Sequence, residues 1–193
     1  MPSIPVLSPA QASEWDAAAE AAGIARATLM ETAGRAAASV IAARFPEALR
    51  QGVLVAAGTG DNGGDGWVVA RALHRLEVPL WVAPLAGEAS ALQQRMATLA
   101  RAEGVRVVAP DGPWPSLGLL VDAILGTGAR GAPRPPAAAL VQRLLDASLP
   151  IAALDGPTGV DLLTGVSHGV PIRAALTITF GGLRRGHLLA RED

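Results

Sequence analysis

Short apolar runs alternate with amphipathic stretches along most of this chain. Each apolar run is bounded by glycine, proline or polar residues, which is typical of a buried strand. The predicted strands lie at residues 53–57, 79–85, 105–108, 119–123, 151–154 and 175–180. Segments at 67–76, at roughly 89–103 and ending near Ala147 have apolar residues at helical spacing. Strands that alternate with helices predict an α/β fold with a mainly parallel, doubly wound sheet.

Two helices are predicted ahead of the first strand. Residues 8–11 form a capping box with proline at the first helical position, and this helix is expected to stop near Gly23. A second box at residues 28–31 is expected to open a helix that runs to about Phe45. Gly34 lies inside the second helix, where alanine would be more stable by about 1 kcal/mol. Close packing against a neighbouring helix explains this glycine best.

The chain is organised around a glycine-rich stretch at residues 58–66, between a predicted strand and a predicted helix. Its glycines fit the G-x-G-x-x-G pattern of dinucleotide-binding loops, but no carboxylate ends the next strand, 79–85, to bind a ribose. Asp61 and Asp65 lie inside the stretch instead, where they would repel a pyrophosphate. Carboxylate and amide oxygens there suit ribose hydroxyls or a cation. Two structural alternatives remain open: Asp65 caps the helix by accepting from the Val68 N–H, and Asp61 and Asn62 form Asx-turns.

The polar loops all follow strands, so they are expected to meet at the carboxyl edge of the sheet, where doubly wound folds bind ligands. Asp122 interrupts an apolar strand, and its burial would be costly without a cation, a hydroxyl or a backbone partner. Asn62, Asp122 and Thr158 together offer oxygen ligands for a hard cation. The alternative for Asp122 is a hydrogen bond to a neighbouring loop.

A phosphate site is predicted separately at Gly126–Gly128 with Arg130, because this loop offers backbone, hydroxyl and guanidinium donors and no carboxylate. Arg184 and Arg185 could also hold a phosphate, or they could be solvated loop residues.

Composition narrows the possible chemistry. The 193 residues suit one domain, and a net charge of −1 without charged runs gives no indication of nucleic-acid or membrane binding. All 16 basic residues are arginine and cysteine is absent, which excludes Schiff-base lysines, thiolate nucleophiles and cysteine metal sites. No signal peptide or transmembrane run is recognisable, so a soluble cytoplasmic protein is expected.

The chain resembles the NAD(P)H-hydrate epimerases, the YjeF N-terminal domain family. The resemblance is carried by residues 30–34, 60–66, 122–128, 155–159 and 177–180. It implies a Rossmann-like three-layer α/β/α sandwich, usually dimeric, spanning residues 1–193. It also implies epimerisation of R and S NADHX and NADPHX, the hydrated forms of NADH and NADPH. An ATP- or ADP-dependent dehydratase would then use the S form, and it could be the second domain of a longer protein.

The resemblance also implies site residues, position by position. A potassium ion would be held by Asn62, Asp122 and Thr158. The substrate would contact Asp61, Asn62, Gly63, Gly64, Asp65, Gly126, Thr127, Gly128, Ala129, Arg130, Gly131, Ala132 and Asp155. Asp155 is the hypothesis for the catalytic acid/base, and Asp65 is the alternative.

Two other functions are weighed against epimerisation. An NAD(P)-dependent oxidoreductase is disfavoured because the ribose acid and a Tyr-Lys pair are missing. A non-catalytic ligand-binding or scaffold module on the same fold is the remaining alternative. Arg184 stands where the family commonly has lysine, so a proton-transfer role at this position is in doubt, because arginine does not give up its proton.

Overall fold

Six parallel strands form the central sheet of the computed structural model, which describes residues 4–190. They are β2 (Val53–Ala57), β3 (Leu80–Pro84), β4 (Arg106–Val107), β5 (Leu119–Ala123), β6 (Ile151–Leu154) and β7 (Leu176–Ile178). The strand order is β4-β3-β2-β5-β6-β7, and Val55 of β2 lies opposite both Val82 and Val121. The order therefore reverses between β2 and β5, which makes the carboxyl ends of these two strands the switch point of a doubly wound sheet.

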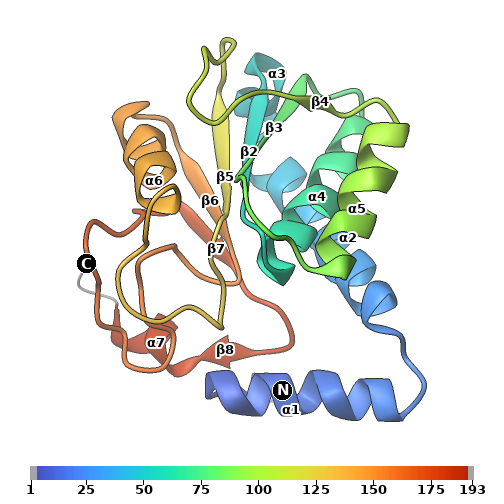
Figure 1. Ribbon diagram of the computed structural model, residues 1–193, viewed down its shortest axis with the longest axis vertical. Helices are drawn as coiled ribbons and strands as arrows, with labels where there is room; N and C mark the ends of the chain where they lie inside the picture. Colours follow the sequence, from blue (N-terminus) through green and yellow to red (C-terminus); the bar gives the residue numbers. More distant parts are fainter. Residues whose placement is uncertain (1–3, 191–193) are drawn as a thin grey trace.

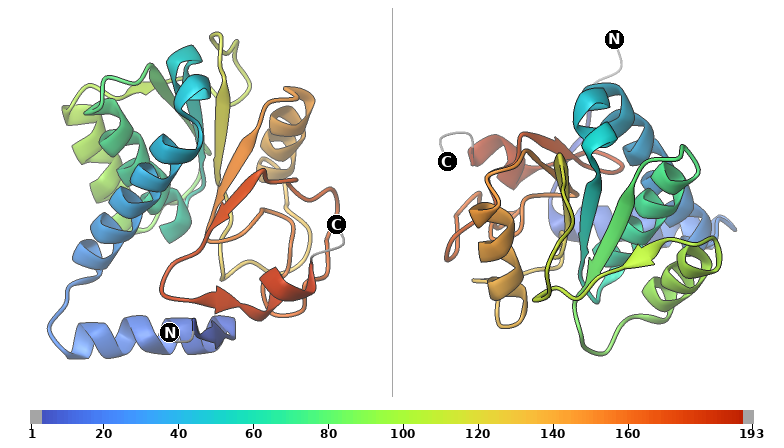
Figure 2. Two further views of the ribbon diagram at one scale, coloured as in Figure 1. Left: turned by 180° about the vertical axis from the view of Figure 1, so that it is seen from behind. Right: turned by 90° about the horizontal axis from the view of Figure 1, so that it is seen from above.

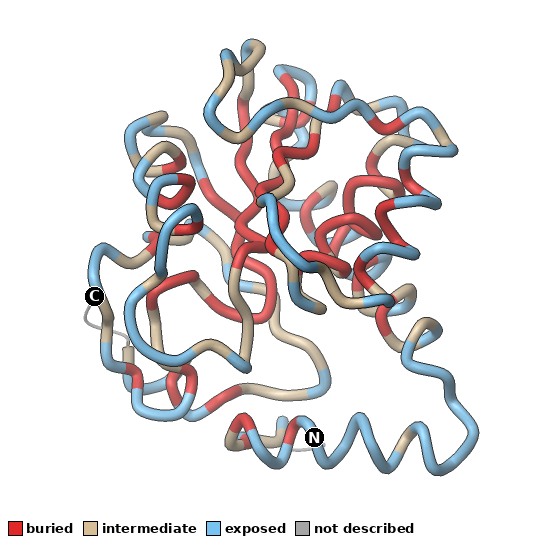
Figure 3. Tube along the Cα trace, viewed as in Figure 1, coloured by how far each residue is buried: buried red, intermediate tan, exposed pale blue. Residues whose placement is uncertain are grey.

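Helices cover both faces of the sheet and give the predicted three layers (Figure 1). Side chains alternate between the faces of a strand, so Val53 and Val55 pack with α2 (Arg26–Arg44), α4 (Asp61–His74) and α5 (Ala91–Ala102). Leu54 and Ala56 pack with α6 (Ala137–Asp146) on the other face. The strands of the sheet centre are buried on both sides (Figure 3), which explains why they read as uninterrupted apolar runs.

The N-terminal segment lies outside this sandwich. β1 (Val6–Leu7) pairs in parallel with β8 (Leu183–Arg184), which leads into α7 (Arg185–Leu189). α1 (Pro9–Ala21) begins with the predicted capping box on Ser8 and crosses beyond the carboxyl edge of the sheet, as Figures 1 and 2 show. Among residues 4–190, no helix is long and apolar enough to cross a membrane.

The predicted start of α2 is wrong. The helix begins at Arg26, after an N-cap Ala25 that makes no side-chain capping bond, and a short α3 (Pro46–Gln51) follows it. Glu31 does not cap the helix because it forms an ion pair with the buried Arg71 of α4. The prediction that Gly34 permits close packing against a neighbouring helix is confirmed, since a Cβ at this position would lie 2.5 Å from the Cβ of Val68 in α4.

Candidate functional site

The glycine-rich stretch is mostly helix rather than loop. α4 begins at Asp61 after the N-cap Gly60, which makes no side-chain capping bond, so Asp65 lies in the second turn. The predictions that Asp65 caps this helix and that Asp61 and Asn62 form Asx-turns are therefore wrong. The first backbone N–H groups of a helix have no intrahelical partner, so the start of α4 presents donors at the switch point.

Glycines let β2, β5 and α4 approach one another closely here. The Gly58 N–H donates to the Ala123 carbonyl at 2.9 Å, and a Cβ on Gly58 would lie 1.9 Å from the Ile124 carbonyl oxygen. Gly63 and Gly64 are packed similarly, the first against the backbone of Gly58 and the second against the side chain of Met30. These two glycines thus serve the packing of α4, and their Cα atoms face protein rather than the cleft described next.

A cleft of about 720 Å³ opens at the carboxyl edge of the sheet, between the sheet and α1. Most of the residues predicted to bind substrate line it, whereas Gly63, Gly64 and Gly131 do not. The predicted residues that line it are Asp61, Asn62, Asp65, Gly126, Thr127, Gly128, Ala129, Arg130, Ala132 and Asp155. Two loops far apart in sequence and the start of α4 therefore share one cavity, as the strand order requires.

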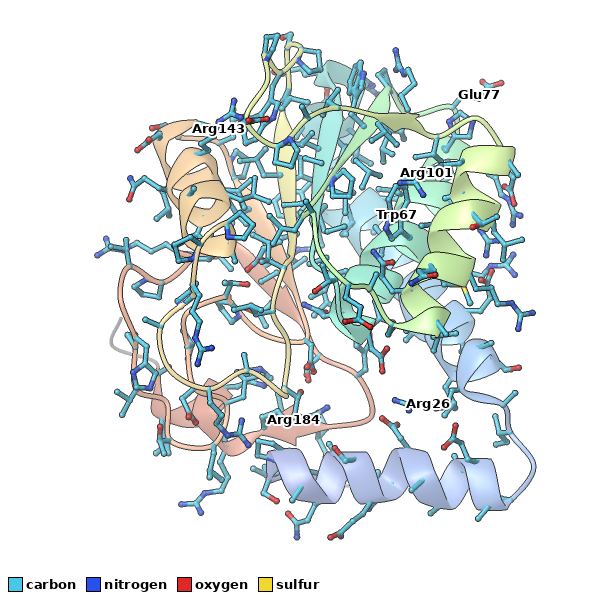
Figure 4. All side chains as sticks on the ribbon, viewed as in Figure 1. Arg26, Trp67, Glu77, Arg101, Arg143 and Arg184 are labelled. Atoms are coloured by element: carbon cyan, nitrogen blue, oxygen red, sulfur yellow. The ribbon has the colours of Figure 1, made fainter. Side chains whose placement is uncertain are left out.

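Asp61 is held at the rim of the cleft by two partners. Arg26 Nη2 donates to Asp61 Oδ2 at 2.8 Å, and Ser90 Oγ donates to Asp61 Oδ1 at 2.9 Å. Figure 4 shows Arg26 in the space between α1 and α2. Both oxygens of this carboxylate are engaged, and the ion pair is half-exposed, so its net contribution to stability is small.

Asp65 lies deeper in the cleft. Burial is the main cause that raises the pKa of its carboxyl well above the ordinary value, and the neighbouring carboxylates of Asp155, Asp61 and Asp16 add to the shift. This environment favours the protonated form of the carboxyl, and a carboxyl that keeps its proton above the ordinary aspartate pKa can donate it to a ligand, which is the requirement for a general acid.

Asp155 is fixed at the end of β6 by donors on both oxygens. The Thr127 N–H donates to Oδ2 at 2.6 Å, the Thr127 hydroxyl makes a short hydrogen bond to the same oxygen, and Arg184 Nη2 lies 3.4 Å from Oδ1. The backbone of Asp155 has a φ of 62°, in the left-handed region that residues other than glycine rarely adopt. Such strain persists where surrounding contacts over-determine the conformation.

The two arginines after β7 have different surroundings. Arg184 is buried, with 5 % of its surface exposed, whereas Arg185 is exposed. The solvated-loop alternative is therefore wrong for Arg184. Arg185 is exposed as that alternative expects, but it begins α7 and does not lie in a loop. The predicted phosphate site also changes, because the Thr127 donors already bond to Asp155 and Arg130 Nη1 donates to the Thr127 and Ala129 carbonyls of its own loop.

Asp122 and Thr158 lie beneath the cleft and are bonded to each other. Thr158 donates to Asp122 from its N–H and its hydroxyl, both at 2.8 Å, and the Ile124 N–H donates at 3.1 Å. The hydrogen-bonded alternative for Asp122 is thus present in the structure. Burial raises the pKa of the Asp122 carboxyl to about 6, although these hydrogen bonds oppose the shift.

Asn62 is the candidate cation ligand whose side-chain amide is not already hydrogen-bonded within residues 4–190. Its side-chain Oδ1 and Nδ2 are both buried and have no hydrogen-bond partner among the residues that the structure describes. Buried amides are nearly always paired, so an orphaned pair of polar atoms at a cleft points to a bound species. No group of three or more His, Cys, Asp or Glu side chains among residues 4–190 could hold a metal, so a cation here would depend on amide, hydroxyl and carbonyl oxygens together with Asp122.

Sequence reasoning missed several residues of the cleft. Arg26 and Ser90 reach Asp61 from 35 and 29 positions away, and Ser13 and Asp16 line the cleft from α1. No local pattern could have identified them, because each lies on a mostly exposed helix or at a helix end, where a polar residue is ordinary. Only the tertiary arrangement brings them to the site.

The fold and the cleft together define a doubly wound α/β protein with an open cleft at the switch point of its sheet. The sequence model of the YjeF-related protein N-terminus matches residues 26–186, and the chain belongs to this family.

Named relatives and a solved structure are similar to the chain. A bifunctional NAD(P)H-hydrate repair enzyme, Nnr, of Pyrobaculum aerophilum is 40 % identical over 90 % of this chain and 36 % of its own length. An NAD(P)H-hydrate epimerase of Pirellula staleyi is 36 % identical over 81 % of this chain and 72 % of its own length. The crystal structure of the yeast protein ynu0 has a TM-score of 0.87 and 28 % identity, and the match covers 98 % of this chain and 85 % of the yeast chain. The chain thus spans about a third of the length of the bifunctional relatives, as the 36 % coverage shows.

Proposed function

We propose that this chain is an NAD(P)H-hydrate epimerase, which interconverts the R and S forms of NADHX and NADPHX. The observation that carries the proposal is the pair of carboxyl groups, Asp65 and Asp155, facing one cleft at the switch point of the sheet. The relative from Pirellula staleyi, most of whose length the chain matches, is named for this activity.

The substrate is assigned to the residues around the cleft. Its sugar and nicotinamide parts would contact the start of α4, the loop after β5 and the carboxylate of Asp155. The proposed set remains Asp61, Asn62, Gly63, Gly64, Asp65, Gly126, Thr127, Gly128, Ala129, Arg130, Gly131, Ala132 and Asp155. Gly63 and Gly64 would take part through their backbone rather than by lining the cavity.

Proton transfer is assigned to Asp65, with Asp155 as the fixed partner. Epimerisation breaks the bond between the ring carbon and its hydroxyl oxygen, and water adds to the opposite face of the same carbon. A protonated carboxyl gives its proton to the departing hydroxyl, the ring nitrogen lone pair stabilises the resulting cation, and a carboxylate takes a proton from the added water. Support for Asp65 comes from its raised pKa, whereas both Asp155 oxygens already accept from Thr127 and Arg184.

Potassium is proposed as the cation of the site, held by Asn62, Asp122 and Thr158. The fit is supported by the unpartnered Oδ1 of Asn62 and by the ligand set containing one carboxylate, the buried Asp122, which suits a monovalent ion bound by oxygen atoms. When bound, the ion would offset the charge of Asp122 and bring the amide of Asn62 to a fixed position.

The domain extent, cellular location, oligomeric state and partner enzyme are proposed from the family. Residues 1–193 would act as one epimerase domain, in the cytoplasm and as a homodimer. The S product would go to an ATP- or ADP-dependent dehydratase, either on a separate chain or on the same one, as the word bifunctional in the names of several relatives suggests.

A coupled assay tests the proposal. Purified R-NADHX is mixed with an S-specific, ATP-dependent dehydratase, and recovery of NADH absorbance is followed with and without this protein. Fast recovery that depends on the protein is expected in potassium chloride, with a slower rate and a lower Tm in lithium chloride at equal ionic strength. A folded protein that leaves recovery at its spontaneous rate would contradict epimerase activity and favour a non-catalytic binding module. Equal rates in the two salts would contradict the potassium site alone.

A further inference from the structure

Arg184 has an unusual environment for a cation. It is one of two buried arginines among residues 4–190, and the other, Arg71, is paired with both Glu31 and Glu103. Within the described part of the chain, Arg184 has a single ion-pair partner, Asp155, whose side chain reaches the cleft. Burying a cation costs desolvation free energy, which one carboxylate only partly offsets. An arginine buried beside one carboxylate of a candidate site therefore indicates a role in that site.

Backbone carbonyl groups bind one nitrogen of the Arg184 guanidinium, and its other two nitrogens face Thr127 and Asp155. Nη1 donates to the Phe180 carbonyl at 3.2 Å and to the Gly182 carbonyl at 2.7 Å, which fixes the plane of the group. Nε then lies 3.4 Å from the Thr127 hydroxyl, and Nη2 lies 3.4 Å from Asp155 Oδ1. The planar fork of arginine is suited to such simultaneous contacts.

Arg184 and Thr127 contact different carboxylate oxygens of Asp155. Thr127 bonds to Oδ2 through its N–H and hydroxyl, and Arg184 faces Oδ1. Arg184 itself does not line the cleft, so its influence on a ligand there must pass through the side chains that do. The strand that carries it, β8, is in turn held by β1, where Leu7 lies opposite Arg184 in the register.

We infer that Arg184 is a positioning residue for the epimerase site: its guanidinium orients the Asp155 carboxylate and the Thr127 hydroxyl toward the cleft and takes no part in proton transfer. This inference rests on the proposed function. It assigns Arg184 an electrostatic and geometric role, for which the permanent charge of arginine is an advantage rather than a defect.

The test compares Arg184→Ala with Arg185→Ala, which removes the exposed neighbouring guanidinium, in the coupled assay. Arg184→Ala is expected to lower kcat by about 30- to 100-fold, as a small misplacement of a reacting group does, and to change KM by less than about 3-fold because the cleft lining is intact. Millimolar guanidinium chloride is expected to restore at least part of kcat by refilling the site, with no effect on the wild type. Arg185→Ala is expected to behave like the wild type.

Each other result overturns a defined claim. A folded Arg184→Ala protein with wild-type kcat overturns the positioning role. A loss of kcat that accompanies a large fall in Tm and does not respond to guanidinium overturns it too, since Arg184 would then only hold the fold. If Arg184→Ala does not fold, Arg184→Met keeps the buried volume without the charge, and wild-type kcat in that variant overturns the role. An inactive wild-type protein refutes the proposed function instead.

Discussion

Two aspartates of one cleft have opposite environments. Asp155 is surrounded by donors from Thr127 and Arg184, whereas the nearby charges that act on Asp65 come from other carboxylates. Environments of this kind give two identical side chains different tasks, one fixed and one able to exchange a proton. The chemistry of the site is therefore decided by the partners of each residue and not by its type.

Asp65→Asn is expected to reduce epimerase activity by about 100-fold or more, the usual effect of removing an acid/base group, and to make the protein more stable at neutral pH. The raised pKa means that the folded state favours the neutral carboxyl, so wild-type stability falls as pH rises from the ordinary aspartate pKa through the folded pKa. The asparagine variant has no ionisable group at this position, so its free energy of unfolding does not fall with pH for this reason. Its Tm should exceed that of the wild type at pH 7–8, by about 2–4 °C for each kcal/mol gained.

The advantage in Tm should disappear below about pH 4, where Asp65 is neutral in both the folded and the unfolded states. The control is Asp111→Asn, which changes an exposed aspartate and should leave activity and the pH dependence of Tm as they are. Equal Tm values of wild type and Asp65→Asn from pH 4 to pH 8 would contradict the buried-carboxyl account.

At the scale of elements, α2 and α4 form the contact that aims the start of α4 at the cleft. Gly34 of α2 lets the two helices meet at Val68, and the ion pair of Glu31 with Arg71 joins the same helices further along. Met30 of α2 packs on Gly64, three positions after the start of α4, whose first N–H groups have no intrahelical partners. Small residues at this contact therefore position the polar residues of the site.

Gly34→Ala is expected to destabilise the protein by about 1–3 kcal/mol, as overpacking of a core does, although alanine alone would favour the helix by about 1 kcal/mol. The added Cβ would lie 2.5 Å from the Val68 Cβ, and the helices must move apart to admit it. Denaturant unfolding measures the change. Gly128→Ala is the control, because in residues 4–190 no heavy atom beyond its chain neighbours lies within 4 Å of its added Cβ, and it should unfold like the wild type. A Gly34→Ala protein more stable than the wild type would show that the helices separate without cost.

On the scale of the whole molecule, the N-terminal segment completes a cleft that the sandwich leaves open. α1 contributes Ala12, Ser13 and Asp16 to the lining, yet only Pro9 and Ala12 of this helix are buried. Its attachment to the rest depends on β1, which pairs with the strand that carries Arg184. The segment lies outside residues 26–186, the part matched by the family model.

Deletion of residues 1–25 is expected to leave the sandwich folded and the site impaired. The six-stranded sheet and its covering helices all lie after this segment, so far-UV circular dichroism should retain a cooperative thermal transition, at a lower Tm. KM should rise about 10-fold, which corresponds to about 1.4 kcal/mol of lost binding, and kcat should fall because β8 loses its partner strand. Steady-state kinetics in the coupled assay measures both. Unchanged KM and kcat would show that α1 is not part of the site.

The sequence by itself determined the sheet and the loops that carry the site. Strands such as 53–57 and 119–123 were predictable because a strand buried on both faces must be apolar throughout and must end at polar or glycine residues. Their parallel order placed the polar loops at one edge, and Asp122 stood out because its strand is otherwise apolar. These are properties of neighbouring residues, which a local pattern records.

Only the tertiary structure decided which of those residues have partners. The start of α4 at Asp61, the burial of Arg184 beside Asp155, the contact of Arg26 with Asp61 and the place of α1 over the cleft each join segments far apart in the chain. An arginine after a strand has the same local pattern whether it is solvated or buried, as Arg185 and Arg184 show. Its environment is set by what the folded chain brings against it, because burial and ion pairing depend on distance in space and not on spacing in sequence.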